Sequence, residues 1–245
     1  MKKTSNTDYE DASTWSGRIA VGVVLLVVLV VAGAALTIWA WIDNDDARRS
    51  AGKPAVTAAR TDAYTSMCGQ DARDFDKPAS DFPAHPQTLQ SGARIAVLDG
   101  VGPCRIDDDI PRGYVFSPKG ATLAAVNYAS VVTAGGPDVP QTLKALQLRG
   151  AGTETMVADA KRRPLPATGQ AVVKGVKVVA TSRATDVRVV VAVEFPSEPG
   201  VVMAWTLTLT WTDHDWKVHP MDTTAGWEMS RVSSLTREGF TTWGF

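Results

Sequence analysis

The chain has 245 residues, and its 25 lysines and arginines against 26 aspartates and glutamates give a formal net charge of -1. This balance argues against nucleic acid as the main partner, because domains that bind nucleic acid carry a clear excess of positive charge. Beyond the first 42 residues, about 200 remain, which is enough for one folded domain with a core and a linker.

The first feature along the chain is an apolar run over 19–42, which follows a short polar tail, 1–18. The run contains no charged residue, and as a helix it would be about 36 Å long, enough to cross a bilayer. It ends in Trp39 and Trp41, which suit a membrane–water interface, rather than in the small residues of a cleavage site. We therefore expect a retained transmembrane helix, with a cleaved signal peptide as the alternative.

Basic residues flank this run on both sides, so their distribution does not decide its orientation. The tail is short, and both cysteines, Cys68 and Cys104, follow the run. A lone pair of cysteines suits an oxidising compartment, which favours a cytoplasmic tail, an external C-terminal domain and a disulfide. Two unrelated buried thiols are the alternative. Residues 43–90, rich in Ala, Asp, Pro, Ser and Thr, are predicted to form an extracytoplasmic stalk, and 91–245 the globular domain.

Helix signals dominate the first half of this domain. Ser117 is a suitable N-cap, Pro118 fits the first helical position, and Gly135 ends the apolar helical pattern between them. Comparable signals follow twice, so helices are expected before a change of pattern. The predicted elements are a strand over 94–98, a loop over 99–113, and helices over 118–134, 139–149 and 153–162.

The second half of the domain has the period of β-strands. In 203–212, the apolar residues at odd positions, from Met203 to Trp211, alternate with threonines. This pattern predicts a strand with one buried and one polar face. Tight turns are expected on both sides, giving antiparallel strands over 171–181, 187–195, 203–212 and 216–219. Helices followed by a curved antiparallel sheet form an α+β domain, and the cone of nuclear transport factor 2 has this order.

The sequence contains no motif that requires catalysis. His214 lies between Asp213 and Asp215, but a turn explains these residues better than a metal site does. The acidic residues 107–109 lack the spacing of a calcium loop and are predicted to be solvated. No phosphate-binding loop or nucleophile elbow is present. We therefore expect no catalytic residue, no metal and no cofactor.

Two surfaces remain open from the sequence alone. A cone of this type can hold a pocket between helix and sheet, for which the candidates are Asn127, Tyr128, Trp205 and Trp211; alternatively, each is a core residue. The C-terminal segment, which includes Trp243 and Phe240, is too apolar to be free. It either packs on its own domain or contacts a neighbouring subunit.

Three segments, 113–132, 205–220 and 234–245, resemble membrane-anchored proteins of actinobacterial mobile elements. These are similar to conjugation proteins of the VirB8 and TcpC type, in the nuclear-transport-factor-2-like superfamily. The resemblance implies a single-pass cell-membrane protein that is a non-catalytic scaffold in a conjugative, type IV secretion-like apparatus. Its expected partners are the membrane, other subunits and further copies of itself, without direct binding of nucleic acid. The alternative function is a ligand-binding or sensing module anchored at the cell surface.

Overall fold

The computed structural model describes residues 63–71, 83–164, 169–183, 185–221 and 229–243. All of them belong to one compact unit, Ala58–Phe245. The predicted tail, 1–18, and transmembrane helix, 19–42, lie outside the described residues. Within the described ranges, no helix combines the length and the apolar character needed to cross a bilayer.

An antiparallel sheet forms the second half of the domain, as the alternating pattern predicted. Its strands lie in the order β10–β5–β6–β7–β8, and β9 pairs with β7. Asp213 and His214 both have positive φ angles, 52° and 64°, which fits a two-residue hairpin turn between β7 and β8. The strands are β5 (Val172–Arg183), β6 (Asp186–Glu194), β7 (Val202–Thr212), β8 (Asp215–Val218), β9 (Met229–Arg231) and β10 (Thr241–Thr242).

The predicted register of β7 is confirmed. Trp205, Leu207, Leu209 and Trp211 are buried, whereas Thr206, on the opposite face, is exposed. The neighbouring strand supplies matching valines, because Val191 pairs with Trp205 and Val189 with Leu207. Only Met203, at the end of the series, is partly buried. This face of the sheet is therefore one side of the main core.

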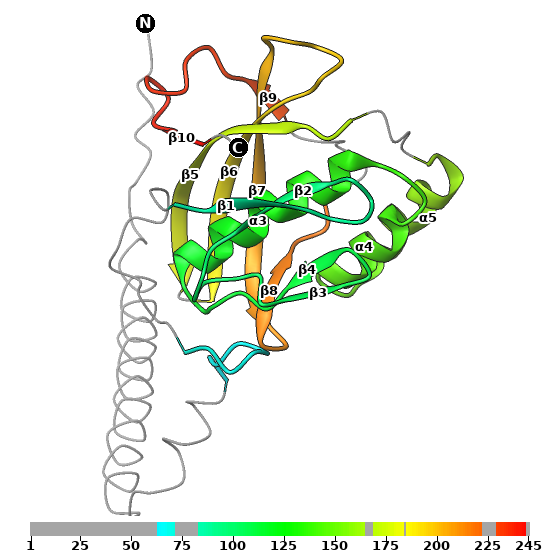
Figure 1. Ribbon diagram of the computed structural model, residues 1–245, viewed down its shortest axis with the longest axis vertical. Coiled ribbons are helices and arrows are strands. Elements are labelled where there is room, and N and C mark those ends of the chain that lie inside the picture. Colours follow the sequence, from blue (N-terminus) through cyan, green and yellow to red (C-terminus); the bar gives the residue numbers. More distant parts are fainter. Residues whose placement is uncertain (1–62, 72–82, 165–168, 184, 222–228, 244–245) are drawn as a thin grey trace, which may run out of the picture. The chain divides into compact units, whose positions relative to one another are not determined.

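Helix α3 (Pro118–Ala134) lies across that face (Figure 1). It begins as predicted, since the Ser117 hydroxyl accepts a hydrogen bond of 3.1 Å from the Gly120 amide. The hairpin of β1 (His85–Thr88) and β2 (Arg94–Val97) covers its other side (Figure 1). The helix is therefore buried on almost its whole circumference. Two further helices follow, α4 (Val139–Leu146) and α5 (Ala151–Arg162).

The α+β class is thus confirmed, but two hairpins were not predicted. Strand β1 lies inside the segment 43–90, which the sequence predicts to be a stalk. The predicted loop 99–113 contains β3 (Arg105–Asp107) and β4 (Ile110–Arg112). All residues of β1 are exposed, and its sequence, His-Pro-Gln-Thr, lacks the alternation of polar and apolar residues that predicts a strand. The strands β3 and β4 have three residues each, and Pro111 interrupts the usual strand pattern.

The far face of the sheet is partly covered by the C-terminal segment. Val190, Ala192 and Ala204 form a second small core with Val232 and Phe240. The Lys177 ammonium lies 4.5 Å from the centre of the Phe240 ring, a cation–π distance. Strand β10 pairs with β5 next to this cluster. The C-terminal segment therefore packs on its own domain, the first of the two arrangements that the sequence allowed.

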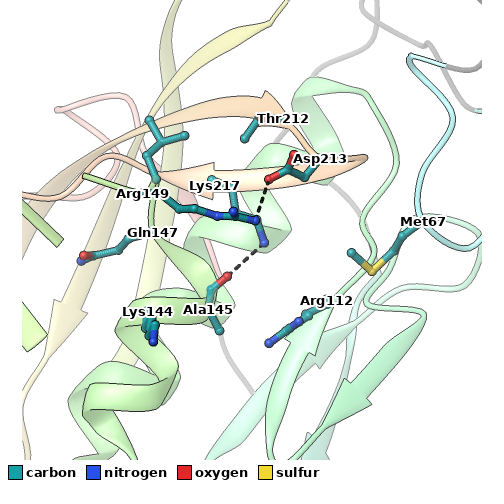
Figure 2. Close-up of a pocket in the computed structure, with 10 residues that line it drawn as sticks. Met67, Arg112, Lys144, Ala145, Gln147, Arg149, Thr212, Asp213 and Lys217 are labelled. Atoms are coloured by element: carbon teal, nitrogen blue, oxygen red, sulfur yellow. Dashed lines mark hydrogen bonds and ion pairs between the residues drawn. The ribbon is translucent and has the colours of Figure 1, made fainter. Parts of the chain in front are cut away.

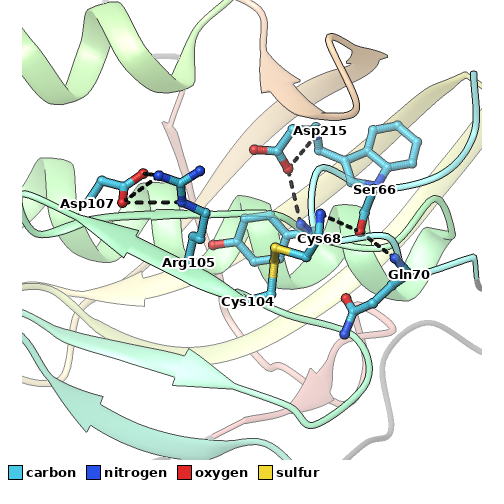
Figure 3. The surroundings of a disulfide bond; sticks show 9 residues. Ser66, Cys68, Gln70, Cys104, Arg105, Asp107 and Asp215 are labelled. Carbon is cyan, nitrogen blue, oxygen red and sulfur yellow. Dashed lines mark hydrogen bonds and ion pairs between the residues drawn. A yellow bond between two sulfur atoms is a disulfide. The ribbon is translucent and has the colours of Figure 1, made fainter.

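The predicted disulfide joins Cys68 to Cys104 (Figure 3). The Ser66 hydroxyl accepts hydrogen bonds from the amides of Cys68 and Gln70, at 3.3 and 3.1 Å, and so holds the turn around the first cysteine. Tyr64 stacks on Phe116, with 4.5 Å between ring centres. The end of the predicted stalk is therefore fixed to the domain by a covalent bond and by packing.

Gly113 lies against this disulfide, and we expect Gly113→Ala to destabilise the domain by about 2–3 kcal/mol. A Cβ atom there would collide with the Cys104 sulfur, and the backbone has a φ of 77°. Gly100→Ala is the matched control, because Gly100 has a φ of 73° with no neighbour within 4 Å. Its cost should be about 1 kcal/mol, from backbone strain alone. Equal losses in chemical denaturation would show that the contact with the sulfur is unimportant.

Candidate functional site

The four residues proposed from the sequence as a pocket all lie in the core. Asn127, which is fully buried, links α3 to β2: its amide oxygen accepts from the Ala96 amide at 2.7 Å, and its nitrogen donates to the Ala96 carbonyl at 2.8 Å. The same nitrogen donates to the Tyr114 hydroxyl at 3.0 Å. The side-chain amide of Asn127 thus makes with Ala96 the two hydrogen bonds that the backbone of a neighbouring strand would make. Its role is structural.

The three aromatic candidates belong to the main core. Tyr128 and Trp205 pack with 5.7 Å between ring centres, and the Tyr128 hydroxyl accepts from Gln147 at 2.6 Å. Burial raises the pKa of Tyr128 above its ordinary value, so it stays protonated. The Trp211 indole donates to the Ala63 carbonyl at 2.8 Å. None of these side chains lines the cleft described next.

The candidate site is a half-open cleft of about 660 Å³ (Figure 2). One wall is the end of α4 and the segment after it, where the Leu148 amide donates to the Val218 carbonyl of β8 at 2.9 Å. The β7–β8 turn and strand β4 form the other walls, and Met67 lies next to the disulfide. The lining residues are Met67, Arg112, Lys144, Ala145, Gln147, Leu148, Arg149, Thr212, Asp213 and Lys217.

A buried ion pair lies at the base of this cleft. The Lys217 ammonium is 3.8 Å from a carboxylate oxygen of Asp215, and it donates to the Ala145 carbonyl at the end of α4, at 3.0 Å. The other Asp215 oxygen accepts from the amides of Tyr114 and Trp216, at 3.2 and 2.9 Å. This network ties β8 to α4 and β4.

Burial shifts the pKa of both partners in the direction of the neutral form. It raises the pKa of the Asp215 carboxyl, although Lys217 and the backbone amides act in the opposite direction. It lowers the pKa of Lys217, against the attraction of Asp215, and the nearby positive charge of Arg112 lowers that pKa further. The positive charge of Arg149 also lowers the pKa of Lys217, whereas the negative charge of Asp213 raises it.

The remaining cations have weak partners or none. Arg149 is 3.7 Å from Asp213, but both side chains are largely exposed, 92% and 64%, so water screens this pair. The Nε of Arg112 is buried and has no hydrogen-bond acceptor within the described part of the chain. Lys144 is exposed in the last turn of α4. The arrangement can bind an anionic group, because its only carboxylate at the surface is Asp213.

The acidic and histidine residues singled out from the sequence have structural roles. A ring nitrogen of His214 lies 2.9 Å from the Thr65 carbonyl, next to the turn that Asp213 begins. Asp109 accepts from the amides of Gln90 and Ser91, at 2.9 and 2.5 Å, and these bonds lower its pKa. Among the described residues, no three His, Cys, Asp or Glu side chains lie close enough to hold a metal ion.

Sequence reasoning missed the cleft because its cations come from separate elements. Arg112 ends β4, Lys144 and Arg149 flank the end of α4, and Lys217 lies in β8. No spacing connects them along the chain, and each reads locally as a solvated charge. The one available signal was Lys217, a charged residue between Trp216 and Val218 in a strand pattern.

Comparison with protein families places most of the chain in one of them. The model of the family described as "Domain of unknown function (DUF8175)" matches residues 48–242. No match was found among curated proteins or among solved structures. The matched range includes the disulfide, the sheet and every residue that lines the cleft. The chain therefore belongs to the DUF8175 family.

Proposed function

We propose that the protein is a membrane-anchored, non-catalytic assembly component of a conjugative, type IV secretion-like apparatus. Its apolar run, 19–42, is the anchor, and its folded domain is outside the cytoplasm. The disulfide between Cys68 and Cys104 supports the external location, because such bonds persist in oxidising compartments.

The observation that carries this proposal is the filled interior of the domain. The side chains of Tyr128 and Trp205 occupy the space between α3 and the middle of the sheet, in which a cone-shaped domain would hold a ligand. A domain whose interior is packed acts through its surface, which favours a scaffold over a sensing module that depends on an internal pocket.

Two further features support the setting. The segments that carry the resemblance to conjugation proteins contain the start of α3, the β7–β8 hairpin and the C-terminal segment with β10, which all pack in the same domain. Register shifts along β5 bend the sheet next to α3, as a nuclear-transport-factor-2-like cone requires. We therefore propose that the domain has the nuclear-transport-factor-2-like cone fold.

The proposal is tested by gene deletion in the native host. Transfer of the mobile element should fall by at least about a hundredfold, and the intact gene should restore it. A version in which a cleavable signal peptide replaces 19–42 should be exported and folded yet fail to restore transfer. Mass spectrometry of the protein from the membrane fraction should find the residues of the anchor. Unchanged transfer in the deletion strain would refute the assembly role, and a mature N-terminus near residue 43 would refute the anchor.

A further inference from the structure

The cleft beside the disulfide carries an excess of cations that the domain does not neutralise. Lys217 is neutralised from within, since it lies 3.8 Å from Asp215 and donates to the Ala145 carbonyl. Within the described ranges, Arg112 and Lys144 have no carboxylate partner, and Arg149 has only the exposed Asp213; Figure 2 shows Arg112 and Arg149 on opposite sides of the cleft. An anionic ligand would therefore gain several charge-assisted hydrogen bonds without displacing a buried ion pair.

Arg112 gives the most direct indication of a missing acceptor. Its Nε is buried without a hydrogen-bond partner in the described ranges, and an unsatisfied buried donor is unfavourable. Its guanidinium is rigid and planar, and it matches a carboxylate in a two-pronged geometry. A carboxylate beside Arg112 would supply the acceptor that this donor lacks within the described ranges.

The shape and the apolar lining of the cleft favour a peptide over a small inorganic anion. Its volume of about 660 Å³ is far larger than a phosphate ion. Met67, Ala145 and Leu148 contribute apolar surface beside the cations, and methionine adapts to varied side chains.

We propose that this cleft receives an acidic segment of a partner subunit, with carboxylates on Arg112, Lys144 and Arg149 and an apolar side chain between Met67 and Leu148. The identity of the partner as a subunit rests on the proposed function. The chemistry of the site does not, because it follows from the charges and the lining of the cleft. The occupant is a peptide rich in Asp or Glu with interspersed aliphatic residues.

The test uses the full chain, purified in detergent with its disulfide intact. The probe is a fluorescein-labelled peptide of alternating Glu and Leu, and its control replaces every Glu with Gln. Fluorescence anisotropy should show saturable binding of the Glu peptide with a Kd below about 1 mM, weakening as salt is raised. The Gln peptide should bind at least about tenfold more weakly.

Matched double variants locate the binding. Lys144→Gln/Arg149→Gln removes two exposed charges from the cleft, and Lys161→Gln/Arg188→Gln removes two exposed charges elsewhere. The first should weaken binding by about tenfold and the second by less than about twofold. All four side chains are exposed, so both variants should fold, which thermal unfolding confirms.

Several outcomes would overturn the proposal. Equal losses in the two double variants would show general charge attraction without a site. Absence of saturable binding, or equal binding of the Gln peptide, would contradict the proposal of an acidic partner. Full competition by inorganic phosphate at concentrations similar to those of the peptide would show that the ligand of the cleft is a small anion and not a peptide. None of these results depends on the transfer assay, so failure of the cleft and failure of the assembly role are separable.

Discussion

Trp205→Ala is expected to lower the free energy of unfolding by about 3–5 kcal/mol, the usual cost of truncating a large buried aromatic residue. Trp205 is fully buried in the middle of the face that packs on α3. Its ring contacts Tyr128, and its indole donates to the sulfur of Met221 at 3.2 Å. The substitution removes this packing and leaves a cavity. A domain has about 5–15 kcal/mol of stability in total, so this loss is a large fraction of it.

Thr208→Ala, on the other face of the same strand, is the matched control. Thr208 is only half-buried and lies outside the small core formed by the C-terminal segment. Its loss should cost less than about 1 kcal/mol. The free energies of unfolding of both variants are to be measured with guanidinium chloride on residues 58–245. Trp205→Phe is included as a milder variant that keeps a measurable transition. A tolerated Trp205→Ala together with a damaging Thr208→Ala would mean that the register of β7 is wrong.

Removal of the disulfide should have a similarly large effect. Cys68 and Cys104 are 36 residues apart, and closing a loop of this size lowers the entropy of the unfolded chain by an amount worth about 4 kcal/mol. Cys68→Ser/Cys104→Ser should therefore unfold at a clearly lower denaturant concentration than the oxidised protein. The reduced wild-type protein is the control and should match the double variant.

Peptide mapping without a reducing agent tests the same bond in the native host. A peptide linked through Cys68 and Cys104 is expected. Two cysteines that react freely with an alkylating reagent would contradict both the bond and the proposed external location of the domain.

The elements that the sequence predicted best are those with a long, regular pattern. In β7 the alternation runs from Trp205 to Trp211, and burial on one face of a sheet preserves it without exception. Helix α3 was equally clear, because Ser117 and Gly135 mark its two ends. The hairpin β3–β4 was missed because strands of three residues are too short to show an alternating pattern and because Pro111 argues against a strand.

The site was predictable only in part, for a different reason. Cysteines pair with cysteines, so two of them sufficed to predict the disulfide. Asn127 was predicted as a pocket residue because a cone can hold a pocket between helix and sheet; the sequence does not reveal that the backbone of Ala96 satisfies its amide. The cations of the cleft are brought together by the docking of the segment 147–149 on β8, a long-range contact without a local signal.

The disulfide also determines how the domain would carry a mechanical load. Tension applied to the chain before Cys68 passes through the sulfur–sulfur bond to Cys104 and bypasses the residues between them, including the hairpin β1–β2. About 120 Å of extended chain is thereby withheld from stretching, at about 3.4 Å per residue. The load enters the domain next to β3 and β4, just before α3 in the chain. The hairpin β1–β2, which covers α3, would therefore not be unfolded by tension applied before Cys68.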